Sequence, residues 1–229
     1  LKKYKNLIPI INSDDSFKRY KRIFKNYFSK VHIGLHLDTG INRLGLNEEE
    51  FLKIMSNKDL NISIILSHLA SADENKNKYN LIQRNKFEQL IKKVQKKPLR
   101  SLSNSAGIIL GTKYQYDLSR PGIALYGGHN NNSSLKKKIK PVIKLKNQIL
   151  KIKELKKNEY VGYNQTFKTN KNTTVAILGI GYADGISRLL SNKGYAFYKN
   201  FKFKIIGRVS MDSITIDISK HKSILKTGM

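Results

Sequence analysis

Hydrophobic and polar residues alternate in two different patterns along the chain, and the change comes near residue 130. Before it, short apolar runs alternate with stretches in which apolar residues recur at helical spacing. The runs predict strands over residues 7–11, 31–37, 61–66 and 99–102, and helices are predicted after the first three. Strands that alternate with helices are typical of parallel sheets, and we count about five such strand–helix units.

Short β-rich stretches replace the helices further along the chain. They predict strands over residues 142–152, 174–180, 196–198, 203–209 and 213–218. We therefore expect two domains, a partial TIM-type (β/α) barrel over residues 1–134 and a C-terminal all-β domain over residues 135–229. A complete barrel has eight strands, so the first domain is either an open sheet or lacks its first strands.

Polar motifs follow the predicted strands at their carboxyl ends, where barrel folds place active sites. Residues 38–40 (Asp-Thr-Gly) follow the second strand, His68 the third, and residues 104–105 (Asn-Ser) the fourth. Taken singly, each is more often structural, as a turn, a hydrogen-bonded histidine or a helix cap. Together with Arg120 they predict a ring of polar groups over one mouth of the sheet, which suits a phosphorylated aromatic cofactor.

Residues 119–128 place one cation beside backbone that can bind an anion. Pro121 donates no hydrogen bond, and Gly122 lets the backbone approach a ligand closely. The amides of Gly122 and Ile123 can therefore bind phosphate. Residues 123–126 (IALY) are typical of a short buried strand that ends at a Gly-Gly turn. The alternative to a phosphate site is an Arg-Pro turn that only leads into this core strand.

The chain of 229 residues carries a net charge of +28, which is typical of nucleic-acid binders. Only eight of its 44 basic residues are Arg, however, and the lysines are spread through predicted helices and loops. Base and phosphate recognition favour Arg, so we expect no nucleic-acid partner.

The chain has no cysteine, no secretory-type start and no apolar run near the ~18 residues of a membrane span. We therefore expect a cytoplasmic protein without disulfides, metal site or membrane partner.

Seven motifs make the chain resemble bacterial alanine racemase, a pyridoxal-phosphate enzyme with an N-terminal barrel and a C-terminal β domain. The resemblance covers nearly the whole chain, and the motifs occur in the family's order. They are residues 38–45 (DTGINRLG), 67–73 (SHLASAD), 103–106 (SNSA), 119–127 (SRPGIALYG), 161–163 (VGY), 181–185 (GYADG) and 207–212 (GRVSMD).

The resemblance implies a reaction. Members of this family interconvert L-alanine and D-alanine through a pyridoxal 5′-phosphate aldimine, and so supply D-alanine for the cell wall. The reaction removes the α-proton from one face and returns a proton to the other, so two bases must flank the substrate. Tyr163 matches the tyrosine base, which the family places in the active site of the partner subunit. The resemblance therefore implies a homodimer with shared sites.

The resemblance also implies roles for the other motif residues. Arg120 matches the arginine that faces the pyridine nitrogen of the cofactor and keeps it unprotonated. The remaining matches to the cofactor site are His68, Asn104, Ser105, Gly122 and Ile123, the last three as phosphate ligands. The matches to the substrate site are Arg43 and the Met211 amide, for the carboxylate, and Tyr182, for an aromatic at the entry.

The chain departs from the family in two larger features. It contains no Lys-Ala-Asn-Ala-Tyr-Gly type motif, which carries the lysine that binds the cofactor and serves as the other base. The C-terminal segment with a further phosphate-binding tyrosine is also missing. We therefore expect a chain that is truncated at both ends and does not racemise alanine by itself.

Two single positions depart from the family as well. His36 stands where many members have a carbamylated lysine beside Arg43, and Ser101 stands where a histidine supports Arg120. The His36 side chain points to the opposite face of the predicted strand from that of Ile33. We therefore expect His36 to face the barrel interior and to contact Arg43.

Two other functions stay open from the sequence. One is racemisation of a different amino acid, because the matched residues bind only the carboxylate. The other is a non-catalytic fragment or degenerate homologue, in one version associated with nucleic acid. A Lys-Ala-Asn type motif encoded before Leu1 would separate an alanine racemase from this last alternative.

Overall fold

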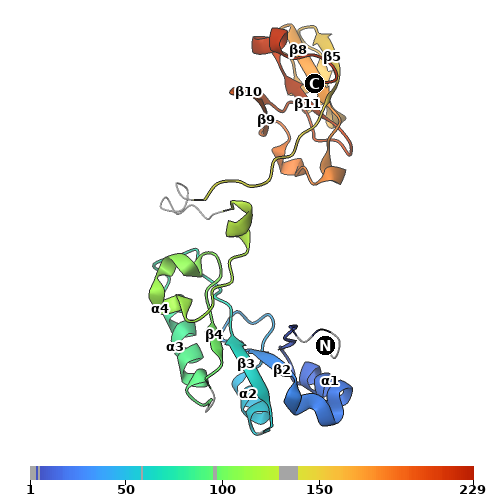
Figure 1. Ribbon diagram of the computed structural model, residues 1–229. Helices are drawn as coiled ribbons and strands as arrows, with labels where there is room; N and C mark the ends of the chain where they lie inside the picture. The colour runs from blue at the N-terminus through green and yellow to red at the C-terminus, as the bar shows by residue number, and fades with distance from the viewer. Residues whose placement is uncertain (1–3, 5, 58, 95–96, 129–138) are drawn as a thin grey trace. The chain divides into compact units, whose positions relative to one another are not determined.

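The computed structural model describes residue 4 and residues 6–57, 59–94, 97–128 and 139–229. The chain forms two compact units, Leu1–Ile143 and Lys144–Met229 (Figure 1). The first is an α/β unit and the second is built from antiparallel strands, as the change in hydrophobic pattern predicts. The predicted boundary between residues 134 and 135 lies outside the described residues.

A four-stranded parallel sheet organises the first unit, in the order β1-β2-β3-β4. Every neighbouring pair is parallel, so the carboxyl ends of all strands lie at the same end of the sheet. The polar motifs that follow the strands are thereby brought to one side. The strands are β1 (Ile10–Ile11), β2 (His32–His36), β3 (Asn61–Leu66) and β4 (Leu99–Ser101).

Three helices connect these strands: α1 (Asp14–Phe24), α2 (Glu48–Met55) and α3 (Tyr79–Ile91). Helix α1 begins after Ser13, whose hydroxyl accepts the Ser16 amide, and α2 begins after Asn47, whose side chain accepts the Glu50 amide. Shorter pieces follow β4 or α1, namely α4 (Thr112–Gln115) and the 3₁₀ segments η1 (Lys25–Lys30), η2 (Gly107–Leu110) and η3 (Ile123–Tyr126). No helix in the described part of the chain is long and apolar enough to cross a membrane.

One hydrophobic core holds the sheet and helices of the first unit together. Ile33, Leu35 and Leu37 of the β2 segment are fully buried, and α3 adds Phe87 and Leu90. Full burial of a side chain of this kind contributes about 1.5–3 kcal/mol. The core therefore provides a rigid base for the loops at the carboxyl end of the sheet.

Antiparallel strands build the second unit, and residues 144–229, all of them described, contain no α-helix. The structure thus confirms the predicted β domain. Ala176, Phe203 and Ile216 lie in its main apolar cluster. The pairs are β8 (Thr173–Leu178) with β5 (Ile149–Leu155) and β11 (Ile214–Asp217), β9 (Tyr195–Tyr198) with β10 (Phe201–Lys204), and β6 (Tyr160–Val161) with β7 (Phe167–Lys168). The 3₁₀ segments are η4 (Tyr163–Gln165), η5 (Tyr182–Asp184), η6 (Arg188–Leu190) and η7 (Ser219–Ile224).

The segment Ile123–Tyr126 is a 3₁₀ turn, so the prediction of a buried strand there is wrong. Its residues Ile123 and Leu125 are each 63% exposed. The Leu125 amide donates to the Gly122 carbonyl (3.0 Å), so local bonds satisfy the backbone. No described strand pairs with this segment, and an apolar run without a pairing partner gains nothing from the extended form.

The strand predicted over residues 142–152 begins only at Ile149. Val142, Ile143 and Leu145 are exposed and outside any strand. Apolar and polar residues alternate here as in a half-buried strand, but no described strand lies beside them to pair with.

Candidate functional site

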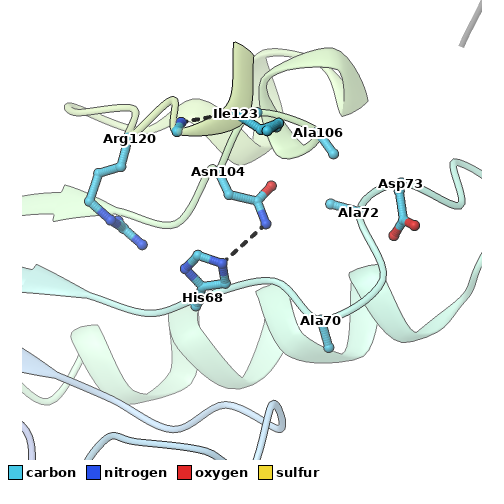
Figure 2. Close-up of a pocket in the computed structure, with 10 residues that line it drawn as sticks. His68, Ala70, Ala72, Asp73, Asn104, Ala106, Arg120 and Ile123 are labelled. Atoms are coloured by element: carbon cyan, nitrogen blue, oxygen red, sulfur yellow. Dashed lines mark hydrogen bonds between the residues drawn. The ribbon is translucent and has the colours of Figure 1, made fainter. Parts of the chain in front are cut away.

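A pocket of about 310 Å³ lies where the loops after β3 and β4 meet residues 120–123 (Figure 2). Its wall includes Ala70, Ala72, Asp73 and Ala106. The structure thus brings three of the polar motifs together, although they are far apart in the sequence. Six residues predicted for the cofactor site line this pocket: His68, Asn104, Ser105, Arg120, Gly122 and Ile123.

Arg120 is a half-buried cation held by neutral oxygens. One guanidinium nitrogen donates to the Ser101 hydroxyl and another to the Ser67 carbonyl. No carboxylate among the described residues pairs with it. Burial lowers the pKa of Arg120 from its ordinary value, but a guanidinium stays protonated at neutral pH. The pocket therefore contains a positive charge that favours an anion or a hydrogen-bond acceptor.

Asn104 fixes the protonation state of His68 (Figure 2). Its Oδ1 accepts the Gly107 amide (2.9 Å) and its Nδ2 donates to the Leu69 carbonyl (3.2 Å), which sets the orientation of the side-chain amide. Nδ2 also lies 3.3 Å from His68 Nε2. Because Nδ2 can only donate, Nε2 must accept, and His68 is a neutral imidazole with its proton on Nδ1.

The electrostatics of the pocket agree with this neutral state. Burial lowers the pKa of His68, and the charges of Arg120 and Arg43 lower it further. The pKa of His36, at the end of β2, is likewise lowered by burial and by both arginines, while Asp38 acts in the opposite direction. His36 Nε2 is buried and has no hydrogen-bond partner in the described part of the chain. Both imidazoles are thus uncharged at pH 7.

Ser105 joins the loop after β4 to residues 122–124. Its hydroxyl accepts the amides of Gly122 (2.8 Å) and Ala124 (3.2 Å). Ile123 lies between these two residues, and its amide donates to no described residue. A Cβ on Gly122 would meet no described residue within 4 Å, so the described part of the chain leaves space beside it. Of the predicted phosphate ligands, the Ile123 amide is therefore free, and the Gly122 amide is bonded to Ser105.

Gln83 was missed from the sequence, although it lies directly behind the loop that carries His68. It is fully buried, accepts the Ala70 amide and donates to the His68 carbonyl. The position of Gln83 in the sequence does indicate that this residue is unusual. Gln83 stands four residues before Phe87 on the core-facing stripe of α3, where an apolar residue is the rule.

Arg43 does not line the pocket. It follows a turn in which the Asp38 carboxylate accepts the amides of Gly40 (2.9 Å) and Asn42 (3.1 Å). Arg43 is exposed and forms no hydrogen bond or ion pair with a described residue. The expected contact with His36 is therefore not a hydrogen bond, and Arg43 acts on His36 through its charge.

In the second unit, residues 181–185 and 207–212 meet through their main chains. The Tyr182 amide donates to the Ser210 carbonyl (2.9 Å), and the Ala183 amide donates to the Met211 carbonyl (3.0 Å). A Cβ on Gly181 would overlap both of these carbonyl oxygens. Only glycine therefore permits this approach.

Residues 161–163 join the same group of loops. Gly207 has φ +77°, and a Cβ on it would lie 2.8 Å from the Val161 carbonyl. The structure thus gathers all three motifs of the second unit. The predicted site residues Tyr163, Tyr182 and Met211 stand on these loops and are exposed.

Comparison with known proteins shows the family of this chain. The family model for the N-terminal domain of alanine racemase matches residues 1–130, and the model for its C-terminal domain matches residues 142–228. The alanine racemase of Rickettsia bellii is 38% identical over 218 residues, which are 93% of this chain and 53% of that protein. The alanine racemase of Rickettsia canadensis is 40% identical over 220 residues, 93% of this chain and 59% of that protein. The chain spans less than two thirds of the length of these relatives.

Solved structures show the same likeness. The crystal structure of alanine racemase from Bartonella henselae with covalently bound pyridoxal phosphate has a TM-score of 0.82 and 32% identity, and the match covers 97% of this chain and 62% of that one. The alanine racemase of Clostridium difficile 630 has a TM-score of 0.83 and 26% identity, over 97% and 60% of the two chains. These matches confirm the predicted fold class, part of a TIM-type barrel followed by a β domain.

Proposed function

Because the chain belongs to the alanine racemase family, we propose that its first unit binds pyridoxal 5′-phosphate and that the whole protein interconverts L-alanine and D-alanine. The observation that carries this proposal is the pocket lined by Ser105, Ile123 and a half-buried Arg120 that pairs with no carboxylate among the described residues. The product D-alanine would serve the cell wall, and the protein would act in the cytoplasm.

The donors of the pocket suit a phosphorylated ring. Phosphate oxygens accept hydrogen bonds, and the Ser105 hydroxyl and the Ile123 amide can both donate. Gly122 leaves room for the phosphate, since a Cβ there would meet no neighbour among the residues that the structure describes. His68 and Asn104 supply a wall without charge, against which an aromatic ring can pack.

Arg120 is proposed to meet the pyridine nitrogen. A guanidinium donates hydrogen bonds and gives up no proton at neutral pH, so the nitrogen it contacts stays unprotonated. When bound, the pyridoxal group supplies an electron sink that weakens the bond between the α-carbon and its hydrogen. Arg120 limits the strength of that sink, which favours return of the proton to the α-carbon over side reactions.

The second unit and Arg43 are proposed to handle the substrate. Tyr163, which is 69% exposed, would remove or return the α-proton on one face. Its exposure supports a role in the site of a partner subunit, so we propose a homodimer. Arg43 and the Met211 amide would hold the carboxylate, and Tyr182 would border the entry. The second base would be a lysine in a Lys-Ala-Asn type motif, which this chain does not contain.

Binding of a cofactor analogue tests the proposal. 4-Deoxypyridoxine 5′-phosphate lacks the aldehyde, so it cannot react with the many surface lysines. We expect saturable binding to the 229-residue chain in isothermal titration calorimetry, weakened about tenfold or more by Arg120→Ala or by removal of the ligand's phosphate. We expect this chain with pyridoxal phosphate to form no D-alanine from L-alanine, because return of the proton to the opposite face needs the second base.

Arg100→Ala is the matched control. Arg100 is an arginine of β4 whose guanidinium is paired with Asp117 (2.7 Å), outside the pocket. This variant should bind the analogue as the parent chain does. Equal affinity for the phosphorylated and unphosphorylated ligands would contradict the proposed site.

A further inference from the structure

Helix α3 carries a polar side chain at a position where the core favours an apolar one. The buried residues of α3 are Asn80, Gln83, Phe87 and Leu90. Gln83 has no exposed surface. A buried amide costs free energy unless its donors and acceptor are all bonded, so the partners of Gln83 show what it stabilises.

Every hydrogen bond of the Gln83 side chain to a described residue leads to the loop after β3 or to a residue bonded to that loop. Its Oε1 accepts the Ala70 amide (2.8 Å), and its Nε2 donates to the His68 carbonyl (3.1 Å). A longer contact joins Nε2 to the Thr39 hydroxyl (3.4 Å), which is 2.7 Å from the Ser67 hydroxyl. Helix α3 thus anchors residues 67–70 from behind, and Figure 2 shows a helix running behind this loop.

Other residues hold the same loop from the pocket side. Arg120 donates to the Ser67 carbonyl, and Asn104 donates to the Leu69 carbonyl and to the His68 ring. Gln83 bonds two further main-chain groups of this loop, the His68 carbonyl and the Ala70 amide. These two groups set the backbone direction on the carboxyl side of His68, and therefore the direction of its side chain.

We propose that Gln83 is a positioning residue for the cofactor site, one that aims the His68 imidazole by holding the main chain on its carboxyl side. This inference rests on the proposed function, because it takes the His68 ring to form a wall of the cofactor pocket. Gln83 itself lies behind the loop and does not line the pocket. Its effect on the cofactor is therefore transmitted through His68.

The substitution Gln83→Met tests this role, because it keeps the length of the side chain and removes all three contacts. Two properties are measured on the 229-residue chain. The first is the tautomer and pKa of His68, from nitrogen chemical shifts of the imidazole, with the signal assigned by His68→Gln. The second is the affinity for 4-deoxypyridoxine 5′-phosphate. We expect the pKa of His68 to rise toward its ordinary value, because the ring leaves its partly buried position, and the analogue to bind about tenfold more weakly.

Asn80→Leu is the matched control for loss of stability. Asn80 is buried on the same helix one turn earlier, and its amide donates to the Ser71 and Glu74 carbonyls (both 3.1 Å). We expect both variants to lower the Tm by about 5 °C, and only Gln83→Met to change the His68 signal. If Gln83→Met lowers the Tm but leaves the His68 signal and the affinity unchanged, Gln83 is only structural and the inference is wrong.

If Gln83→Met does not fold, Gln83→Glu tests the role of Gln83 instead. The carboxylate still accepts the Ala70 amide but cannot donate to His68 or Thr39. An unchanged tautomer and pKa of His68 in this variant would overturn the inference. The two proposals fail separately, because failure of the parent chain to bind the analogue rejects the cofactor site, whereas the His68 signal tests Gln83 without any ligand.

Discussion

The two units hold their candidate site residues by different physical means. In the first unit, buried polar side chains such as Ser101, Thr39 and Gln83 form hydrogen bonds that position the pocket residues. In the second unit, the motif loops meet main chain to main chain, and Gly181 and Gly207 permit the approach. Lost hydroxyl or amide groups should therefore damage the first site, and added methyl groups should damage the second.

The two mechanisms also give different chemical control. The buried network of the first unit sets charge states, since it keeps His68 neutral and, within the described part of the chain, pairs Arg120 with neutral oxygens and no carboxylate. Main-chain packing sets position alone, and Tyr163 and Tyr182 remain exposed on its loops. A site that tunes the electronics of a ring needs a buried network that sets charge states. A site that presents side chains to another surface needs only main-chain packing that sets their position.

The largest effect is expected from Gly181→Ala. The new methyl group would overlap the Ser210 and Met211 carbonyl oxygens, and main-chain atoms cannot move aside without shifting both loops. We expect a loss of about 3 kcal/mol in the free energy of unfolding of the second unit. Hydrogen exchange of β8 and β11 under increasing denaturant measures it unit by unit.

Gly179→Ala is the control for that substitution. A Cβ on Gly179 would lie 3.0 Å from the Leu150 side chain, which is 57% exposed and can turn away. The loss should be well below 1 kcal/mol. If both alanine variants are equally stable, main-chain packing is not what holds the second site.

Ser101→Ala should have a smaller effect on stability and a specific effect on the pocket. Both Ser101 and Ser103 are fully buried, and each hydroxyl donates to a carbonyl at 2.6 Å, of Leu118 and Tyr114 respectively. Only Ser101 also accepts a bond from the Arg120 side chain. We expect Ser101→Ala and Ser103→Ala each to cost about 1–2 kcal/mol of stability.

Affinity for 4-deoxypyridoxine 5′-phosphate separates the two serines. It should fall severalfold in Ser101→Ala, where the guanidinium loses a partner that fixes its direction, and stay near the parent value in Ser103→Ala. A parallel loss in both variants would mean that Arg120 does not depend on Ser101 for its position.

The fold was predictable because its main signals are local. The alternation at His32–His36 and the caps at Ser13 and Asn47 need no distant partner to be recognised. The segment Ile123–Tyr126 was misread because strand formation depends on a neighbour, and the apolar run carries no information about one.

The site was predictable only in part, for a related reason. Parallel strands bring the residues after them to one end, so the meeting of His68 and Asn104 follows from topology. Arg120 follows no strand of the sheet, and its place in the pocket depends on its bonds to Ser67 and Ser101. The tautomer of His68 and the role of Gln83 depend on single hydrogen bonds between distant segments, which periodicity cannot show. Two polar residues on the buried face of α3 were the one local sign.

The smallest effect in this comparison concerns pH. The fold lowers the pKa of both His36 and His68 below the ordinary value of 6.5, so below that pH the unfolded chain binds more protons than the folded chain. The stability contributed by the two neutral imidazoles is thus complete above pH 6.5 and is lost as the pH falls from 6.5 through the lowered folded pKa values. Thermal unfolding between pH 8 and pH 4.5 should show this loss in the first unit.

Arg43→Gln should reduce that acid sensitivity with little change in stability at pH 8. Arg43 is exposed and has no bonded partner among the described residues, but its charge helps to lower the pKa of both His36 and His68. Without it, both imidazoles should titrate at higher pH, and the loss of stability below pH 6.5 should shrink. Arg19→Gln, at an exposed position on α1, is the control and should change neither pKa.

In 1 M salt the Debye length is about 3 Å, so the difference between the parent chain and Arg43→Gln should largely disappear. Imidazole pKa values that are the same in both chains at low salt would show that burial and Arg120 alone keep these histidines neutral.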